Sequence, residues 1–504
     1  MNSPLWLFGD QLGPHFHSTP DFRDREVLLI ESARVLRRRP FHRQKLHLVL
    51  SGMRHLADEL GDRATYLRTE TYREALEQFG KPVVVFEPTS HAAEAFVDGL
   101  FQEGLVEDVL PTPMFALSRA DFAEWAGNRH QFRMETFYRD QRRRFEILMS
   151  GDEPVQGVWN LDEVNREPPP KKQATLGVDP PWWPTEDDID EQVRADLDAM
   201  ELDTVGNDGP RLFAVTAAEA RKALEHFVSY RLQDFGKYED AVMTQDWTMA
   251  HSLLSVPLNM GLLEPIDVAE AAEKAWRDGD ASLASVEGFV RQILGWREYV
   301  WHLYWHFGPE YIDRNELDAH VPLPKWFTDL DGDEPIAACL AHTLSELRDR
   351  GWVHHIPRLM ILGNFALQRG YDPRALTEWF ATAFVDGFAW VMPVNVIGMS
   401  QHADGGRLAS KPYAGGGAYI NRMSDYCGRC RYDVKQRTGP EACPFNALYW
   451  DFLARHDARF RKNPRMRNMY ATWDRMSEDS RREVRASAKT FLASLEPAAP
   501  GWGS

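Results

Sequence analysis

The stretch LWLFGDQL, residues 5–12, joins a short apolar run to a polar turn. Three similar apolar runs follow, and helix-like segments lie between them. The runs are EVLLIES (26–32), ATYLRT (64–69) and PVVVFEP (82–88), and the helix-like segments are HRQKLHLVLSGMRHLADEL (42–60) and YREALEQF (72–79). Strand–helix alternation at this spacing is typical of βαβ units and a parallel sheet. We therefore expect a Rossmann-like α/β domain over residues 1–135.

The polar turn FGDQL, residues 8–12, directly follows the first expected strand. Ligands of parallel sheets bind outside the carboxyl ends of the strands, so this turn is well placed for a ligand contact. It lacks the glycine-rich pattern of a dinucleotide-binding loop, and an ordinary tight turn is the simpler interpretation.

The amino-acid composition changes after the α/β pattern. Residues 136–212 contain the proline-rich and acidic stretches REPPPKKQ (166–173) and VDPPWWPTEDDIDE (178–191), which predict an interdomain linker with little regular structure. Its tryptophans predict that it packs along a domain. From 213 to 504 the pattern is helical, so we expect a large all-α domain. Its helix candidates are 216–235, where Thr216 and Glu219 have capping-box spacing, 283–307, 335–351 and 373–384.

Composition limits the class of protein. The chain has 504 residues, of which 43% are hydrophobic and 27% charged, as in soluble globular proteins. No apolar run is long enough for a bilayer, and the first residues lack signal-peptide features, so we expect a cytoplasmic protein.

The net charge of −18 argues against nucleic-acid binding by the whole surface. Local basic runs at 34–45, 142–145 and 455–467 are either DNA contacts or solvated helix faces.

Three of the four cysteines lie in DYCGRCRYDVKQRTGPEACPFNALYW, residues 425–450. Their spacing is Cys427-x2-Cys430-x12-Cys443, and Cys339 lies far upstream on an expected helix. Four thiolates suit either a structural zinc ion or an iron–sulfur cluster, and spacing alone does not separate the two. A redox-active C-x-x-C pair or free buried thiols are the remaining interpretations.

Aromatic and histidine residues supply two further candidates. The chain has 17 tryptophans, which either fill a large core or relay electrons between closely spaced rings. Trp296, Trp301, Trp305, Trp379 and Trp390 all lie in the helical half. In GWVHHIPRLMILGNF, residues 351–365, His354 and His355 are either ordinary histidines or a proton donor.

Taken together, these stretches resemble the cryptochrome/photolyase family along nearly the whole chain. More narrowly, the chain resembles the bacterial iron–sulfur branch, which includes prokaryotic (6-4) photolyases and related cryptochromes. The matching stretches are 7–12, 247–263, 295–301, 351–365, 386–406, 411–430 and 443–450. The resemblance implies a four-iron four-sulfur cluster on Cys339, Cys427, Cys430 and Cys443.

The resemblance also implies that the all-α domain binds FAD. The positions that match the family's FAD contacts are Tyr238, His251, Ser252, Leu253, Leu254, Ser255, Arg358, Asp386 and Asn395. Trp379 matches the inner electron-relay tryptophan. Phe380 occupies the position at which an oxidisable tyrosine would extend the relay, so the outer relay residues are not identified from the sequence.

The substrate implied is UV-damaged DNA. His354 and His355 match the histidines that face the lesion. Tyr413 and Tyr419 match aromatic residues that line the lesion pocket, and we expect Leu359 and Met399 to form its walls. The antenna of this branch is 6,7-dimethyl-8-ribityllumazine, with contacts expected at Phe8, Gly9, Asp10, Gln11 and Glu31. The implied function is light-driven repair of (6-4) photoproducts by a monomer, by electron transfer from reduced FAD, with protonated His355 as proton donor. The alternatives are a blue-light photoreceptor with the same cofactors, and a helical zinc protein without flavin.

Overall fold

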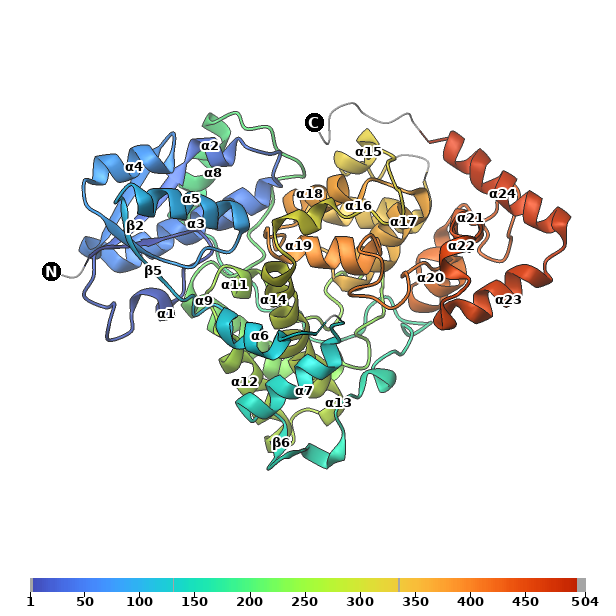
Figure 1. The fold of residues 1–504 in the computed structure, drawn as a ribbon, viewed down its shortest axis with the longest axis horizontal. Coiled ribbons are helices and arrows are strands. Elements are labelled where there is room, and N and C mark those ends of the chain that lie inside the picture. Colours follow the sequence, from blue (N-terminus) through green and yellow to red (C-terminus); the bar gives the residue numbers. More distant parts are fainter. Residues whose placement is uncertain (1–2, 130, 334–335, 496–504) are drawn as a thin grey trace.

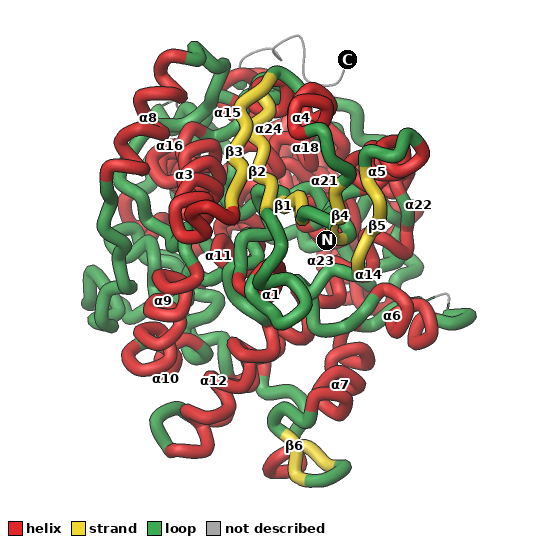
Figure 2. The backbone as a smooth tube through the Cα atoms, turned by 90° about the vertical axis from the view of Figure 1, so that its left-hand side faces the viewer, coloured by secondary structure: helices red, strands yellow, loops and turns green. Residues whose placement is uncertain are grey.

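The computed structural model describes residues 3–129, 131–333 and 336–495 (Figure 1). Its first part contains a parallel five-stranded sheet in the order β3–β2–β1–β4–β5 (Figure 2). The strands are β1 (Leu5–Leu7), β2 (Val27–Ser32), β3 (Ala64–Thr69), β4 (Val83–Phe86) and β5 (Val106–Leu110). The predicted α/β class is confirmed. The sequence pattern missed β5, because this edge strand carries the exposed residues Glu107 and Asp108.

Helices cover both faces of the sheet. Leu5, Leu7 and Leu29 share one buried cluster with apolar residues of α3 (Arg43–Leu60). Trp6 and Leu28, which point the other way, belong to a second cluster with α4 (Tyr72–Phe79) and α5 (His91–Gln102). This alternation follows from the period of two along a strand, and burial on both faces explains why the strands read as continuous apolar runs.

The rest of the chain is predominantly helical, as predicted. Its helices are α6 (Arg119–Ala126), α7 (Met134–Phe145), α8 (Asp188–Ala199), α9 (Ala217–Tyr230), α10 (Leu232–Phe235), α11 (Ser255–Asn259), α12 (Pro265–Asp278), α13 (Leu283–Val290), α14 (Glu298–Phe307), α15 (Lys325–Thr328), α16 (Ala338–Arg350), α17 (Asn364–Arg369), α18 (Pro373–Ala383), α19 (Val391–Pro393), α20 (Gly417–Met423), α21 (Pro444–Arg455), α22 (Asp457–Phe460), α23 (Arg467–Arg475) and α24 (Glu478–Ala493). The α/β part also holds α1 (Pro14–His17) and α2 (Ala33–Leu36). Pro335, the first residue of one predicted helix, lies outside the described residues.

Several short elements interrupt these helices. Three segments are π-helical: η4 (Arg291–Arg297), η6 (Pro357–Gly363) and η7 (Val394–Ser400). The 3₁₀ turns are η1 (Gly61–Arg63), η2 (Val155–Gly157), η3 (Asp162–Val164), η5 (Pro309–Asp313), η8 (Tyr426–Arg429) and η9 (Pro464–Met466). π-Helical segments are rare and concentrate at functional sites. Because η6 and η7 are in contact, they mark one region of the helical part.

The predicted linker, residues 136–212, contains most of α7, the hairpin of β6 (Met149–Ser150) and β7 (Glu153–Pro154), and α8. Residues 165–187, all of them described, form neither helix nor strand. Trp183 stacks on Trp247 at 5.8 Å and Leu176 N donates to Asp246, so this stretch packs along the helical part as its tryptophans predict. The division at residues 135 and 212 stays a prediction.

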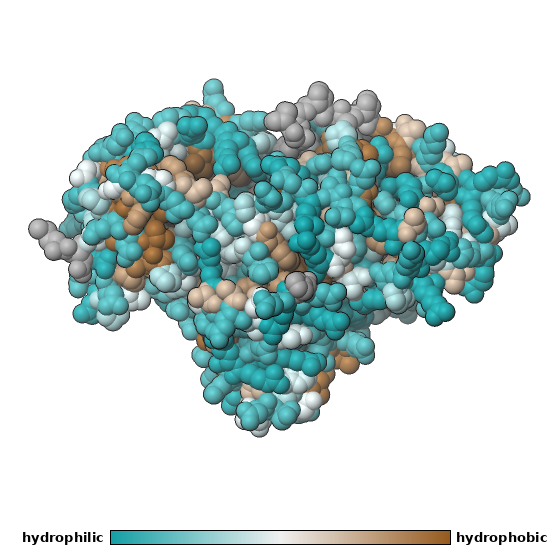
Figure 3. Space-filling model, viewed as in Figure 1, coloured by the Kyte–Doolittle hydropathy of each residue, from teal (hydrophilic) through white to brown (hydrophobic). Residues whose placement is uncertain are grey.

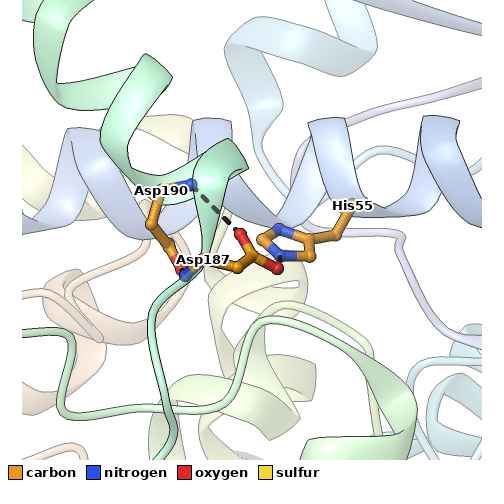
Figure 4. A group of neighbouring side chains, drawn as sticks. All are labelled: His55, Asp187 and Asp190. Carbon is orange, nitrogen blue, oxygen red and sulfur yellow. Dashed lines mark hydrogen bonds and ion pairs between the residues drawn. The ribbon is translucent and has the colours of Figure 1, made fainter.

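A buried charge cluster joins the linker to both larger parts. His55 of α3 points toward Asp187, with Nε2 3.0 Å from Oδ2, and Asp190 lies beside them at the start of α8 (Figure 4). Arg211 donates to Asp190 Oδ2 at 3.1 Å and to Glu219 of α9 at 2.7 and 3.0 Å. The group in Figure 4 brings potential metal ligands together. Because Arg211 already engages Asp190, we interpret the cluster as structural.

Lys45 forms a second link between the α/β and helical parts. Its Nζ donates to Ala381 O at 2.7 Å and to Gly387 O at 2.6 Å, between the rings of Phe41 and Phe388. Burial lowers the pKa of Lys45 to about 7. Lys45 belongs to the basic run 34–45, but its side chain is buried and holds the loop after α18 against α3.

None of the helices in the described part of the chain is both long and apolar enough to cross a bilayer. The face shown in Figure 3 is mostly hydrophilic, and apolar side chains gather mainly over the α/β part.

Replacing Arg211 by methionine should destabilise the protein strongly. The side chains of Arg211 and Asp190 are 1% and 0% exposed, so the change removes the guanidinium partner of a buried carboxylate, which keeps its contacts with His47 and Ser51, at a cost of about 3–5 kcal/mol. Thermal unfolding followed by circular dichroism should show a midpoint several degrees lower. Arg482→Ala, which removes a 78% exposed arginine from α24, should leave the midpoint nearly unchanged, and Asp190→Asn in the Arg211→Met background should restore part of the loss. Equal midpoints for Arg211→Met and Arg482→Ala would contradict this interpretation.

Candidate functional site

A two-pronged ion pair between Arg358 and Asp386 stands at the centre of the candidate site. Nη1 and Nη2 of Arg358 donate to Oδ1 and Oδ2 of Asp386 at 2.8 and 3.0 Å. Arg358 Nε donates to Val353 O at 2.6 Å, and Ser255 Oγ donates to Asp386 Oδ2 at 2.7 Å. Paired charge-assisted bonds fix both position and orientation. The pair therefore joins η6, α11 and the segment before α19 at one point.

The segment His251–Ser255 enters α11 in a constrained conformation. Leu253 has φ +58°, a left-handed value that costs a non-glycine residue about 1–3 kcal/mol. Buried Arg231 donates to the carbonyl oxygens of Met249 at 2.8 Å and His251 at 3.1 Å, and Leu254 N donates to Ser252 Oγ at 3.3 Å. Long-range contacts therefore impose this shape, as is common at ligand sites.

Two buried histidines stack beside this segment. The rings of His251 and His354 lie 4.4 Å apart at 22°. Burial lowers the pKa of His251 to about 3 and that of His354 well below its usual value, so both are neutral at pH 7. His251 Nε2 and both ring nitrogens of His354 have no hydrogen-bond partner among the described protein atoms. These nitrogens are therefore available to a polar ligand.

His355 has an exposed side chain, although many protein atoms surround its ring. Burial, and then the positive charge of Arg358, lower its pKa to about 4. His355 is therefore neutral in the free protein at neutral pH, and its protonated state as donor to the lesion stays a prediction. A bound group with negative charge is needed to raise the pKa of His355.

The tyrosine loop, residues 413–419, places Tyr413 and Tyr419 close together. Burial raises the pKa of both phenols, that of Tyr419 to about 12, and each side chain keeps some access to solvent. Asn364 of α17 exchanges two hydrogen bonds with the backbone of Gly415, each 2.9 Å long, and Gln368 donates to Gly415 O at 2.7 Å. Sequence reasoning missed Asn364 and Gln368 as supports of this loop. Their spacing of four residues on one helix face was the available signal.

Leu359 and Met399 are 7% and 6% exposed and belong to one buried cluster, against which Tyr413 and Tyr419 pack. The structure thus places these four predicted pocket residues within or against the same buried cluster. Their contact with a lesion stays a prediction.

Tyr238 and Asn395, two predicted FAD contacts, have neighbours different from those of the residues described above. Tyr238 is half-buried and packs on the small cluster that includes Met243 and Met249. Asn395, in η7, donates from Nδ2 to Val391 O of the preceding turn at 2.8 Å. Its amide is engaged within its own helix, so its predicted role beside a flavin ring stays a prediction.

The predicted inner relay residue, Trp379, is fully buried among phenylalanines. Its ring lies 4.5 Å from Phe327, 5.0 Å from Phe380 and 6.0 Å from Phe384. Phe384 in turn lies 4.4 Å below the guanidinium of Arg358. Trp379 is therefore one ring away from the central ion pair, and its first neighbours are not readily oxidised.

Three other candidate tryptophans form a group of their own. Trp301 lies 5.6 Å from Trp390 and 5.4 Å from Trp305, with near-perpendicular rings. The other candidate, Trp296, packs against Tyr299 at 6.2 Å. Closely spaced indoles are thus present, and a role for them in electron relay stays a prediction.

All four cysteine side chains lie near one another. Burial and the neighbouring thiols raise the pKa of Cys339 well above its usual value, that of Cys427 to about 12 and that of Cys443 to about 11, with Cys430 among these neighbours. Cys339 is the second residue of α16, and Cys443 immediately precedes α21. Backbone N–H groups at these helix starts favour the thiolate form and oppose the effect of burial.

The cysteines and the tyrosine loop are in direct contact through Gly417. A Cβ atom at Gly417 would lie 2.8 Å from Cys443 Sγ, 3.0 Å from Val434 Cγ2 and 3.1 Å from Asn446 Oδ1. Asn446 Oδ1 also accepts from Gly417 N at 3.0 Å. Only glycine fits this position without displacing a thiol.

The candidate antenna contacts lie at the carboxyl ends of β1 and β2. Asp10 accepts from Thr89, and burial raises its pKa. Gln11 donates from Nε2 to Glu87 O at 3.2 Å, and the ring of Phe8 packs on Trp6 at 4.5 Å. A Cβ at Gly9 would meet Val49 Cγ1 of α3 at 2.7 Å, so the turn lies close against that helix.

Glu31 is engaged differently from the other candidate antenna residues. Its buried carboxylate accepts from Arg54 at 2.7 and 3.2 Å, from Arg68 at 3.1 Å, and from Tyr66. These bonds give Glu31 a structural role between α3 and β3. A contact with an antenna stays a prediction for all five residues.

Many charged residues of the three basic runs form ion pairs or hydrogen bonds within the protein. In run 34–45, the ion pairs are Arg37–Glu70, Arg39–Glu378 and Arg43–Asp198, and Lys45 is buried. In run 142–145, Arg142 donates to backbone carbonyls, and the ion pairs are Arg143–Asp140 and Arg144–Asp121. In run 455–467, the ion pairs are Arg455–Asp451, Arg459–Glu316 and Arg461–Asp474, while Arg465 contacts Ser410. Most of these residues are therefore structural, and their contact with DNA stays a prediction.

This two-part architecture is the fold of photolyases and cryptochromes. The structure resembles a solved bacterial class III photolyase from Agrobacterium tumefaciens, with a TM-score of 0.57 and 17% identity over 98% of each chain. It also resembles a cryptochrome from Synechocystis sp. PCC6803, with a TM-score of 0.53 and 11% identity over 99% of this chain and 96% of the other.

Sequence comparison gives the narrower assignment. Residues 5–213 match the family model described as deoxyribodipyrimidine photo-lyase-related protein. The chain is 40% identical to a (6-4) photolyase of Agrobacterium fabrum, over 98% of this chain and 100% of that protein. The chain therefore belongs to the cryptochrome/photolyase family, in its bacterial branch.

Replacing Gly417 by alanine should reduce the amount of metal bound at the four cysteines several-fold. The new methyl group would displace Cys443 Sγ or the Asn446 side chain, which hold both the thiol site and the tyrosine loop. Metal per chain, measured by inductively coupled plasma spectrometry, gives the result. Gly428→Ala is the matched control, because a Cβ on this glycine of the same cysteine loop meets nothing within 4 Å. Equal metal content in the two variants would refute the proposed constraint.

Proposed function

We propose that this protein repairs (6-4) photoproducts in DNA in a reaction driven by light. The observation that carries the proposal is the position of His355. Its side chain is exposed, and it precedes Arg358 of the ion pair with Asp386 by three residues, in a chain 40% identical over its length to a protein named (6-4) photolyase. The family implies FAD as the cofactor and damaged DNA as the substrate. An extruded dinucleotide lesion needs a pocket with aromatic walls and a proton donor, and Tyr413, Tyr419 and His355 provide these.

The residues around the central ion pair fit FAD. Segment 251–255 offers hydroxyl and backbone N–H groups at the start of α11, which suit phosphate. The unpartnered nitrogens of His251 and His354 and the fixed guanidinium of Arg358 add polar groups in a buried setting. Reduced FAD, when bound there, supplies the electron that light delivers to the lesion and takes it back, so repair involves no net oxidation.

The chain's own contribution is positioning and proton delivery. The Arg358–Asp386 pair and the strained segment 251–255 fix the cofactor side of the pocket. Asn364 and Gln368 fix the tyrosine loop on the lesion side. His355 Nδ1 or Nε2 delivers the proton that oxygen transfer in the lesion requires, after the negative charge of bound DNA raises its pKa.

We infer that the four cysteines hold a four-iron four-sulfur cluster rather than zinc. A tetrahedral zinc ion with bonds of about 2.3 Å brings its sulfurs to within about 3.8 Å of one another. In the described chain no three of the cysteine sulfurs lie within 4.8 Å of one another, although all four are near neighbours. A larger inorganic core bridged by sulfide suits this wider arrangement.

We also propose that the turn after β1 binds the antenna, 6,7-dimethyl-8-ribityllumazine. Support comes from Phe8 and Asp10, which lie at the carboxyl end of a central strand and keep some access to solvent. The raised pKa of Asp10 and its bond from Thr89 mark a polar group held in an otherwise apolar surrounding.

His355→Ala should abolish light-driven repair while the protein keeps its flavin. The change removes the proton donor and leaves the Arg358–Asp386 pair intact. The assay follows restored thymines in an oligonucleotide with one (6-4) lesion under blue light, and flavin absorbance checks loading. His320→Ala, which removes a 69% exposed histidine, is the control. Unchanged repair would remove His355 from the mechanism, and a colourless protein with stoichiometric zinc would overturn the proposed function itself.

The repair rate at saturating damaged DNA should fall as pH rises through the pKa of His355 in the complex. In the free protein that pKa is about 4, and bound phosphates must raise it for the donor form to be populated. Single-turnover repair between pH 5 and 9 gives the profile. A profile that is flat, or that rises with pH, would contradict the role of His355 as donor.

A further inference from the structure

A groove with basic and aromatic side chains lies next to the tyrosine loop. It is lined by Lys435, Arg437, Tyr449, Trp450 and the backbone at Gly415–Gly416. Since Gly415 and Gly416 belong to the tyrosine loop, the groove and the proposed lesion pocket share one stretch of backbone. The groove therefore lies beside the loop that carries Tyr413 and Tyr419.

The groove is rigidly built. Asn446 of α21 donates to Val434 O and to Gln436 O, each at 2.8 Å, and so fixes the loop that carries Lys435 and Arg437. The same side chain accepts from Gly417 N at 3.0 Å. One amide therefore sets the position of the basic loop relative to the tyrosine loop.

The charge of this region contrasts with the rest of the protein. Residues 422–437 contain five exposed cations: Arg422, Arg429, Arg431, Lys435 and Arg437. Within the described chain none of the five forms an ion pair, whereas arginines in all three longer basic runs do. In a protein of net charge −18, a patch of open positive charge favours a polyanionic partner.

The aromatic residues indicate which polyanion fits. The ring of Tyr449 is half-buried and lies 5.1 Å from Trp450, which itself stacks on Trp473 at 5.9 Å and 18°. This backing holds the Tyr449 ring in place. A cationic groove that contains a supported aromatic ring is the usual arrangement for a nucleic-acid strand, with phosphates on the cations and a base on the ring.

We propose that this groove binds the DNA strand next to the lesion, with phosphates on Lys435 and Arg437 and a base on Tyr449. The inference rests on the proposed function, because the strand enters from the lesion pocket. It adds a binding surface formed by the cysteine loop, which the three basic runs do not include.

The first test is a charge-removal variant, Lys435→Ala/Arg437→Ala. Binding of a (6-4)-containing duplex and of an undamaged single strand is measured by fluorescence anisotropy over a range of NaCl concentrations. We expect about tenfold weaker binding and a slope of log K against log salt that is shallower by about 1.4–1.8, as for two lost phosphate contacts.

The matched control is Arg221→Ala/Lys222→Ala on α9, which removes the same two residue types at exposed positions. In Figure 1 this helix lies far from α20 and α21. The control should keep the affinity and slope of the natural protein. If the groove variant matches the control in both, the groove is not a DNA contact.

The second test addresses the aromatic contact. Tyr449→Ala should weaken single-strand binding about tenfold, while Tyr449→Phe keeps it, because stacking needs the ring and not the hydroxyl. An equal loss in both variants, or no loss in either, would overturn the stacking role.

The two proposals fail in different ways. If the natural protein repairs the lesion but the groove variants bind DNA as the control does, only the groove is refuted. If the natural protein repairs nothing, the proposed function fails regardless of the binding results.

Discussion

The ion pair between Arg358 and Asp386 is the interaction on which the rest of the site depends. It joins the helix that follows His354 and His355 to the segment before α19, and Ser255 adds the start of α11. Lys45 holds the neighbouring Gly387 from the α/β part, so the two halves of the molecule meet at this loop. A buried pair of this kind gives little net stability, but it specifies one arrangement of the groups around it. The position of His355 relative to the proposed cofactor site follows from that arrangement.

The cysteine site supports the other side of the pocket. Gly417 packs on Cys443, and Asn446 holds both Gly417 and the loop at Val434–Gln436. Binding of a cluster, placement of the tyrosines and shape of the basic groove therefore depend on the same few contacts. A cluster held by these cysteines would therefore help to fix the surface that we propose to bind DNA, without any change in its oxidation state.

Much of the architecture could be predicted from local pattern. Strands β1 to β4 and helices α3 and α4 follow from apolar periodicity, whereas β5 escaped because its outward residues are acidic and it lies at the sheet edge. The site could be predicted only through the family resemblance, because its contacts join residues far apart in the chain. The stacking of His251 on His354 and the contact of Gly417 with Cys443 left no local signal. The neutral state of His355 in the free protein could not be predicted, because burial, which lowers its pKa, is a tertiary property.

The most direct measurement compares two lesions. The photoreduced protein is illuminated with blue light on an oligonucleotide carrying one (6-4) photoproduct, and separately on one carrying a cyclobutane dimer. We expect restored thymines from the (6-4) substrate alone, because the proposed proton delivery by His355 serves a step that only this lesion requires. A protein that photoreduces normally but repairs neither lesion would contradict the account and indicate a light-signalling protein.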